Sequence, residues 1–294
     1  MSTQRALITG GGGQLASDLY DLLQGDAEVL ALPHGGLDVT DDDAVGAAFS
    51  TFEPTVVFNC AAFHNVEVCE REEDRSFAVN ARAVKRLATR CAETNAKFVH
   101  LSTNYVFDGA ASEPYDEADL PDPRSIYAIS KLAGEYAALA YAPEALVVRT
   151  AGLYGLHGSA SKGGNFVTRM ITRAREQGAL TVVADQRLTP TFTADLAAGI
   201  LAALEAGVNG TLHVTNSGAT SWHGFTEAIM ELAGVEVPVA QGTTTIAPGA
   251  ADRPLNGVLR SSASERAGLA PLRPWRDALA DYLERAGLLA GATA

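Results

Sequence analysis

The feature that most constrains this chain of 294 residues is an alternation of short apolar runs with amphipathic segments. Runs rich in β-branched residues lie at 5–10, 29–33, 55–62, 97–103 and 145–150. Helical patterns lie between them, at 14–24, 41–51, 72–94 and 126–142. Short apolar strands that alternate with helices are typical of a parallel sheet covered on both faces and connected by right-handed crossovers. The first half of the chain therefore predicts a doubly wound α/β fold.

The alternation loosens after Arg149. Residues 152–166 are glycine-rich and residues 240–262 contain Pro248 and Pro254, so both segments are predicted to be loops. Further strands are expected at 181–185 and 211–215, and further helices at 165–177, 192–206, 222–234 and 275–287. We interpret residues 151–294 mainly as a smaller, substrate-binding lobe over the carboxyl edge of the sheet, with some segments returning to the sheet itself.

The charge and the cysteines exclude several classes of function. A net charge of −13 argues against a nucleic-acid or anionic-membrane partner, because phosphate contacts need clustered Lys and Arg. No apolar stretch approaches a membrane span and no export signal is recognisable, so the expected location is cytoplasmic. Cys60, Cys69 and Cys91 lack the spacing of a zinc site or a disulfide framework and are expected to be buried. No metal is predicted.

The stretch TGGGGQLASDL joins the first predicted strand to the first predicted helix. A turn there directs backbone N–H groups and the positive end of a helix at one point, which suits a pyrophosphate. Gly10 and Gly13 permit the tight turn, and Ala16 stands where a third glycine would let the helix pack on the strand. A glycine-rich surface turn is the alternative, since GxxGxxA differs from GxGxxG. The preferred interpretation is a Rossmann-type dinucleotide-binding domain over residues 1–150.

The sequence does not choose between NADH and NADPH. The second strand ends VLALPHGG, which offers neither an acidic residue for a ribose 2′-hydroxyl nor an Arg for a 2′-phosphate. Asp38, in LDVTD, is a candidate contact for the adenine end of the cofactor. Its alternative role is a turn or a cap for the helix that follows.

Tyr127 and Lys131 are four residues apart in a predicted helix and therefore share a face. A neighbouring ammonium is expected to lower the pKa of a tyrosine, which could then protonate a carbonyl oxygen as hydride reaches the carbon. Thr103, at the end of the LST strand, would face the same crevice. The YxxxK pattern alone is common on exposed helix faces, but here it follows a glycine turn and a strand ending in Ser-Thr.

Together these motifs resemble the dTDP-4-dehydrorhamnose reductases, a branch of the extended short-chain dehydrogenases. The shared motifs run in order along nearly the whole chain: TGGGGQLAS, LDVTD, FNCAAF, AVNARA, LSTNYVFDG, YAISK, VVRTAGLYG, NFV, VVADQ, SW and RPLN. The family reduces the 4-keto group of a dTDP-6-deoxyhexose, the last step to dTDP-L-rhamnose. The resemblance thus implies NADPH or NADH as cofactor and a nucleotide-sugar substrate, and a homodimer is one possible assembly.

The resemblance also implies a role for each matching residue. The implied catalytic residues are Thr103, Tyr127 and Lys131. The implied cofactor contacts are Gly10, Gly13, Gln14, Leu15, Asp38, Val39, Ala61, Ala62, Tyr127 and Lys131. The implied substrate contacts are His64, Val66, Thr103, Tyr105, Gly152 and Arg253. For Arg253, a bidentate contact with the pyrophosphate and a structural salt bridge are both open. Some members bind magnesium through glutamates at a dimer contact, but those glutamates cannot be placed here.

The sugar-facing positions depart from the family pattern. Asn104 replaces an Asp, His64 replaces a Thr, and Ala151 and Gly152 stand in for Ser and Trp. Replacing the Trp by glycine is expected to leave a large void, unless another aromatic residue or a larger sugar fills it. Two other functions stay open: a reductase or epimerase of the same superfamily acting on another nucleotide sugar, and a non-catalytic NADP-binding regulatory subunit. The intact Thr, Tyr and Lys favour catalysis.

Overall fold

Six parallel strands form the central sheet of the computed structural model, which describes residues 4–157, 164–245 and 249–291. The strands are β1 (Gln4–Thr9), β2 (Ala27–Leu32), β3 (Val56–Asn59), β4 (Lys97–Leu101), β5 (Leu146–Arg149) and β10 (Gly210–His213). Their order is β10-β5-β4-β3-β1-β2. The order reverses at β1, which pairs with β2 on one side and β3 on the other. Ligands of such sheets bind beyond the carboxyl ends of the strands at this switch point.

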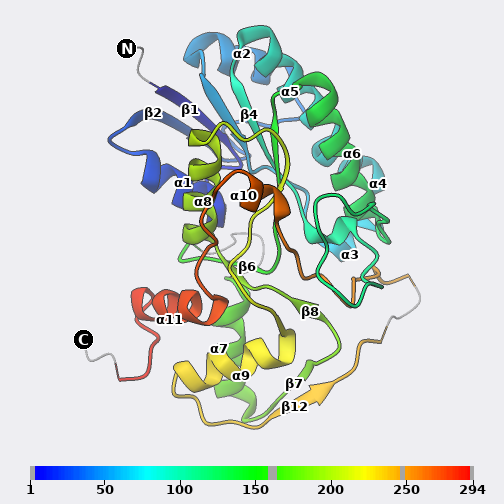
Figure 1. Ribbon diagram of the computed structural model, residues 1–294, viewed down its shortest axis with the longest axis vertical. Coiled ribbons are helices and arrows are strands. Elements are labelled where there is room, and N and C mark those ends of the chain that lie inside the picture. The colour runs from blue at the N-terminus through cyan, green and yellow to red at the C-terminus, as the bar shows by residue number, and fades with distance from the viewer. Residues whose placement is uncertain (1–3, 158–163, 246–248, 292–294) are drawn as a thin grey trace.

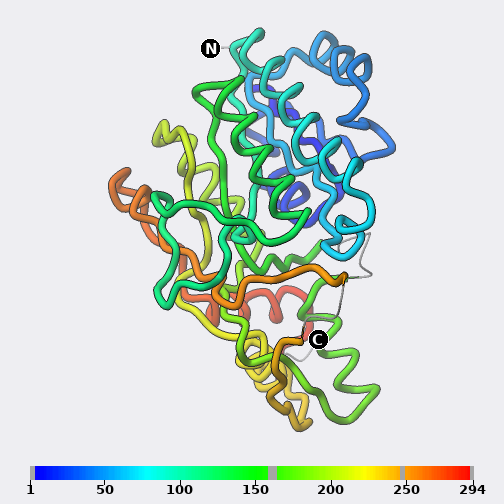
Figure 2. The backbone as a smooth tube through the Cα atoms, turned by 90° about the vertical axis from the view of Figure 1, so that its right-hand side faces the viewer, coloured from blue at the N-terminus to red at the C-terminus, as the bar shows by residue number. Residues whose placement is uncertain are grey.

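Helices cover both faces of the sheet (Figures 1 and 2). On one face, α1 (Gln14–Leu23) and α8 (Thr193–Glu205) pack on the strands through Leu15, Leu19, Leu196 and Ile200. On the other face lie α2 (Asp42–Phe52), α5 (Ala83–Thr94) and α6 (Ile126–Tyr141). Both faces of the sheet are therefore buried, and the predicted doubly wound α/β fold is confirmed.

The helix predicted at 72–94 is divided into three consecutive segments. These are α4 (Glu73–Phe77), a π-helical turn η1 (Ala78–Arg82) and α5. The π turn holds the buried Asn80, whose amide pairs with the backbone N–H and C=O of Phe63 at 2.9 Å each and donates to Ser130 Oγ at 3.0 Å. A π turn of this kind often marks a functional site. Here it ties the loop after β3 to α6.

The smaller lobe lies below the sheet in Figure 1. Its helices are α7 (Phe166–Gln177), α9 (Trp222–Leu232) and α11 (Trp275–Arg285), which enclose an aromatic-rich core with Trp222 and Trp275 packed against it. Its strands pair as β6 (Leu153–Tyr154) with β9 (Thr191–Phe192), β7 (Leu180–Val183) with β12 (Val239–Gly242), and β8 (Arg187–Leu188) with β11 (Thr220–Ser221). Both β10 and α8 come from beyond residue 150 and belong to the sheet layer.

Several short elements were not expected from the sequence. A helix α3 (Val66–Cys69) follows the loop after β3, and a 3₁₀ turn η2 (Asn104–Val106) follows β4. The loop predicted at 240–262 is partly wrong, because β12 overlaps its start and α10 (Ser262–Arg266) begins at its end. Part of the loop predicted at 152–166, residues 158–163, lies outside the described residues.

Candidate active site

Thr103, Tyr127 and Lys131 meet at the carboxyl end of β4, beside which α6 runs (Figure 1). Helix α6 begins after Ser125, whose hydroxyl accepts a hydrogen bond from Ala128 N at 3.3 Å, so Tyr127 falls in its first turn. The Thr103 side chain faces the Tyr127 hydroxyl and lowers its pKa. The structure therefore brings together the three residues predicted to be catalytic.

The Lys131 ammonium group is buried and points toward β4. Its Nζ donates to the carbonyl oxygen of Leu101 at 2.6 Å and lies 3.4 Å from His100 Nε2. Burial lowers the pKa of Lys131 to about 8, although the carboxylate of Glu135 acts in the opposite direction. Lys131 therefore changes charge close to neutral pH.

The expected lowering of the Tyr127 pKa by Lys131 is wrong for this structure. Burial raises the pKa of Tyr127, and the side chain of Thr103 opposes this rise. The reason is geometric, since the Lys131 nitrogen is held by a backbone carbonyl of β4. Thr103 is therefore the immediate partner of the Tyr127 hydroxyl.

The glycine turn between β1 and α1 forms a cradle without side chains. Gly10 has φ of +71°, and a Cβ there would lie 2.8 Å from Ala61 N. A Cβ at Gly11 would lie 2.8 Å from Leu32 N. The N-cap residue of α1 is Gly13, and no side chain caps the helix. The first N–H groups of α1 are thus available to an anion. Gln14 Oε1 is buried with no partner among the described residues.

The other predicted cofactor positions surround this cradle. Ala61 and Ala62 follow β3 and are half-buried, and Val39 is buried under the sheet edge. Asp38 accepts hydrogen bonds from the backbone N and the hydroxyl of Thr40, at 2.9 and 2.7 Å, which lower the pKa of its carboxyl. This is the turn offered as its alternative role, while the cap of α2 is Asp41.

The structure shows no void at the Cβ position of Gly152. Gly152 has φ of +58°, and a Cβ there would lie 2.7 Å from Leu188 Cδ1 and 3.1 Å from Pro190 Cα. The backbone conformation favours glycine, and the space beside it is occupied by the β8–β9 segment. The β8–β9 segment therefore fills the space beside Gly152 at the wall of the site.

Arg253 forms the salt bridge that was one of its two alternatives. Its Nη2 lies 2.7 Å from Glu67 Oε1, and its positive charge opposes the rise that burial causes in the pKa of Tyr105. The Tyr105 ring in turn meets the Tyr127 ring edge-on, with centroids 5.9 Å apart. Val66, the first residue of α3, stands next to Glu67. A single side chain, that of Tyr105, therefore separates Arg253 from the Tyr127 ring.

His64 lies in the loop that leads from β3 to α3. Its Nδ1 is 3.4 Å from the carbonyl oxygen of Ala62. The loop is fixed by Asn80, which pairs with the backbone of Phe63. This arrangement keeps the predicted cofactor contact Ala62 and the predicted substrate contact His64 on one rigid segment.

Asn104 ties the site to a distant segment of the chain. Its Nδ2 donates to the carbonyl oxygen of Gly257 at 3.1 Å, and its backbone N donates to Thr150 O at 2.9 Å. An Asp at this position would set a carboxylate against that carbonyl oxygen, so the departure from the family pattern has a physical reason.

A buried ion pair beside the residues predicted to be catalytic was missed by sequence reasoning. Glu135 on α6 receives three hydrogen bonds of 2.6 to 3.1 Å from Arg149 at the end of β5, and one of 2.5 Å from Ser102 Oγ. Glu135 lies four residues after Lys131, so the helical spacing was a usable signal. The ion pair fixes Ser102, the neighbour of Thr103.

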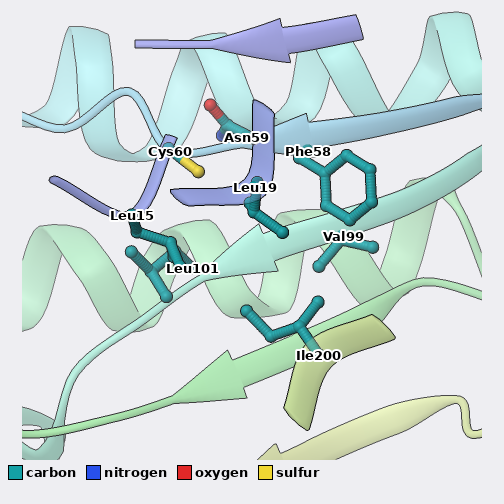
Figure 3. Close-up of a pocket in the computed structure, with 8 residues that line it drawn as sticks. All are labelled: Leu15, Leu19, Phe58, Asn59, Cys60, Val99, Leu101 and Ile200. Atoms are coloured by element: carbon teal, nitrogen blue, oxygen red, sulfur yellow. The ribbon is translucent and has the colours of Figure 1, made fainter. Parts of the chain in front are cut away.

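Two cavities lie near these residues, and neither matches a whole ligand. The first, of about 10 Å³, lies between α1, α8 and the sheet and is lined by the eight residues labelled in Figure 3. It holds about one water molecule at most. The second, of about 180 Å³, lies beside Arg253 and is lined by Val183, Gln186, Thr243, Thr244, Thr245, Ala250 and Ala251.

The structure was also searched for metal sites and membrane spans. Within residues 4–157, 164–245 and 249–291, no three His, Cys, Asp or Glu side chains gather to hold a metal ion. No helix in the same ranges is long and apolar enough to cross a membrane.

Comparison with known proteins gives full-length matches. The family model described as RmlD substrate binding domain matches residues 4–287. The chain is 40% identical to the dTDP-4-dehydrorhamnose reductase of Streptomyces griseus, covering 94% of this chain and 92% of that protein. It is 37% identical to the dTDP-4-keto-6-deoxy-D-glucose reductase of Streptomyces niveus, covering 94% and 96%.

A solved structure resembles the fold throughout. The dTDP-4-dehydrorhamnose reductase of Bacillus anthracis, in complex with NADP, superposes with a TM-score of 0.91 at 32% identity, over 96% of this chain and 99% of that one. The chain belongs to the RmlD substrate binding domain family, together with the dTDP-4-dehydrorhamnose reductases.

Proposed function

We propose that this protein is an NAD(P)H-dependent reductase of the C4 keto group of a dTDP-4-keto-6-deoxyhexose, with dTDP-4-dehydrorhamnose as the first substrate to test. The observation that carries the proposal is the pairing of Thr103 with Tyr127, with Lys131 on the same helix face, beside a glycine cradle at the switch point of the sheet. Full-length relatives that reduce such sugars support it.

The proposed proton donor is Tyr127. Its raised pKa keeps the hydroxyl protonated at neutral pH, so it can give a proton to the sugar oxygen as that oxygen gains negative charge. Thr103 donates to the tyrosine oxygen or to the sugar oxygen, and so stabilises the charge that remains. Lys131, whose nitrogen is already oriented by Leu101, retains N–H groups for a hydroxyl of the cofactor ribose.

The residues around the glycine turn fit a dinucleotide. Gly10 and Gly11 leave no room for a side chain, and α1 begins without a capping side chain, so a pyrophosphate can approach its backbone N–H groups. A bound nicotinamide supplies the hydride. The choice between NADPH and NADH is left to experiment. Because one relative was solved in complex with NADP, NADPH is one of the two coenzymes to be tested.

The substrate contacts are proposed at the wall built by His64, Val66, Tyr105, Gly152 and Arg253. The salt bridge to Glu67 holds the Arg253 guanidinium beside the Tyr105 hydroxyl, where it can also meet a phosphate oxygen. The two relatives reduce different dTDP sugars at similar identity. The class of substrate is therefore better supported than the individual sugar.

The test is to assay a panel of nucleotide sugars with each coenzyme. Turnover is monitored as the loss of reduced-nicotinamide absorbance. We expect turnover with dTDP-4-dehydrorhamnose or with another dTDP-4-keto-6-deoxyhexose, and none with UDP-hexoses. Turnover of a UDP-hexose without net oxidation of the coenzyme would instead identify an epimerase. Tight cofactor binding without turnover of any sugar would favour the regulatory alternative.

A further inference from the structure

A chain of buried polar groups leads from β1 to Lys131. The Thr9 hydroxyl donates to Asn59 Oδ1 at 2.7 Å, Asn59 Nδ2 lies 3.1 Å from His100 Nδ1, and His100 Nε2 lies 3.4 Å from Lys131 Nζ. All four side chains are at most 2% exposed. Three parallel strands, β1, β3 and β4, contribute one residue each. The catalytic role proposed for Lys131 does not account for this chain.

The placement of the Asn59 amide sets the direction of each hydrogen bond. Its Oδ1 faces the Thr9 hydroxyl and accepts from it, and its Nδ2 faces His100 and donates to Nδ1. Burial and the charge of Lys131 hold the pKa of His100 well below its ordinary value, so the ring is neutral and carries one proton. With Nδ1 accepting, that proton sits on Nε2, which faces the Lys131 nitrogen.

A ring N–H facing Lys131 treats its two protonation states differently. An ammonium has only donors, so it meets the Nε2 proton unfavourably, whereas an amine has a lone pair that can accept it. In both states Lys131 keeps its hydrogen bond to Leu101 O. We propose that Thr9, Asn59 and His100 form a hydrogen-bonded chain that presents a ring N–H to Lys131 and thereby favours its uncharged amine in the cofactor-free protein.

Other groups around Lys131 do not replace this effect. On its own helix, Glu135 is neutralised by Arg149 and hydrogen-bonded to Ser102. From the end of β3, the Cys60 thiol has its pKa raised by burial to about 12 and is therefore uncharged. Tyr127, four residues before Lys131, is also uncharged.

Gly134 lies where α6 packs against both the π turn and β4. A Cβ there would lie 2.1 Å from the carbonyl oxygen of Asn80 and 3.2 Å from His100 Nε2. The glycine is therefore required first by the Asn80 carbonyl, and it also leaves room for the His100 ring beside α6.

The inference concerns the charge of Lys131, a residue of the proposed reductase site. Its functional meaning therefore rests on the proposed function. It can nevertheless be tested without cofactor or substrate. The sequence has four lysines, Lys85, Lys97, Lys131 and Lys162. Isotope labelling of the lysine Cε therefore gives few NMR signals. The signal that disappears in a Lys131→Met variant belongs to Lys131. Nitrogen NMR of the histidine rings reads the tautomer of His100 directly, with His100→Gln for assignment.

Thr9→Val is the decisive variant, because it removes the hydroxyl that orients the Asn59 amide while leaving His100 and Lys131 in place. The amide is then free to turn its oxygen toward His100, which moves the ring proton to Nδ1 and offers Lys131 a lone pair. We expect the titration midpoint of Lys131 to rise by about one pH unit. Thr9→Ser keeps the hydroxyl and should match the wild-type protein.

Asn59→Leu supplies a second variant if Thr9→Val does not fold, and it should also raise the midpoint. In the wild-type protein above the Lys131 midpoint, the His100 proton is expected on Nε2. The proposal is overturned if that proton is found on Nδ1, or if a folded Thr9→Val or Asn59→Leu protein titrates Lys131 as the wild type does. None of these outcomes depends on whether the protein reduces a sugar.

Discussion

Single residues at the wall of the site are determined by backbone geometry as well as by side-chain chemistry. Gly152 occupies the left-handed region and is packed against Leu188, so a family tryptophan could not simply be restored there. Asn104 donates to the Gly257 carbonyl, which the usual aspartate cannot do. In both cases the unusual residue is explained by a neighbour far away in the sequence.

Gly152→Ala tests the close contact at this wall. The left-handed conformation alone costs a non-glycine residue about 1–2 kcal/mol, and the contact with Leu188 should add to that cost. Gly207→Ala is the matched control, because Gly207 has φ of +70° and open space around its Cβ position. Denaturant unfolding should show a larger loss of stability for Gly152→Ala. Equal losses would mean that Leu188 moves away without cost.

At the scale of elements, the site depends on one stripe of α6 lying against the end of β4. Tyr127, Lys131 and Glu135 are spaced by four residues. Tyr127 faces Thr103, Lys131 donates to the Leu101 carbonyl, and Glu135 accepts from Ser102. The first two form the proposed reaction site, and the third anchors the helix through Arg149. The stripe therefore couples the position of the residues proposed to be catalytic to a buried ion pair.

Glu135→Gln should destabilise the protein strongly. The substitution keeps the volume but leaves the Arg149 guanidinium buried without a counter-charge, for which a loss of about 3–5 kcal/mol is typical. Glu144→Gln, just beyond the same helix and exposed, should leave the free energy of unfolding within about 0.5 kcal/mol of wild type. The account of the anchor is wrong if urea unfolding gives the two variants the same stability.

The elements themselves were predictable to different degrees. The sheet strands and long helices follow from apolar periodicity, so β1 to β5 and α6 lie close to their expected positions. The π turn at Asn80 and the helix α3 carry no periodic signal, because their conformation depends on contacts with Phe63 and α6. The Thr103–Tyr127 pair could be predicted from motifs, whereas the direction of the Lys131 nitrogen depends on β4 packing.

At the scale of the whole molecule, the switch point between β1 and β3 sets where a ligand can lie. The glycine cradle, the loop with His64 and the end of β4 all follow adjacent strands of the sheet. The second half of the chain contributes β10 and α8 to this layer as well as the smaller lobe. The proposed division near residue 150 is thus a division of sequence, and its functional meaning stays a prediction.

Buried tyrosines in both halves of the molecule predict loss of stability at alkaline pH. Burial raises the pKa of several tyrosines above 10: Tyr105, Tyr115, Tyr127, Tyr154 and Tyr282. Their folded-state pKa exceeds the unfolded value, so their contribution is complete below pH 10 and is lost as the pH rises through the folded value. Urea unfolding should show falling stability above pH 10.

Tyr154→Phe provides the control for this titration. The Tyr154 hydroxyl is buried in the smaller lobe with no partner within the described part of the chain, so its removal at pH 7 should cost little or add about 1 kcal/mol of stability. The decline above pH 10 should then be shallower than in the wild type. An unchanged decline would show that Tyr154 does not titrate with unfolding.

The most direct test of the proposed reductase is the steady-state turnover of Tyr127→Phe with the best dTDP-4-keto sugar of the panel. Loss of the phenol proton should lower kcat by about 10²- to 10⁴-fold while cofactor affinity stays near wild type. Tyr136→Phe, on the same helix and 59% exposed, should turn over normally. Full turnover by Tyr127→Phe would contradict the assignment of Tyr127 as the proton donor and the mechanism built on it.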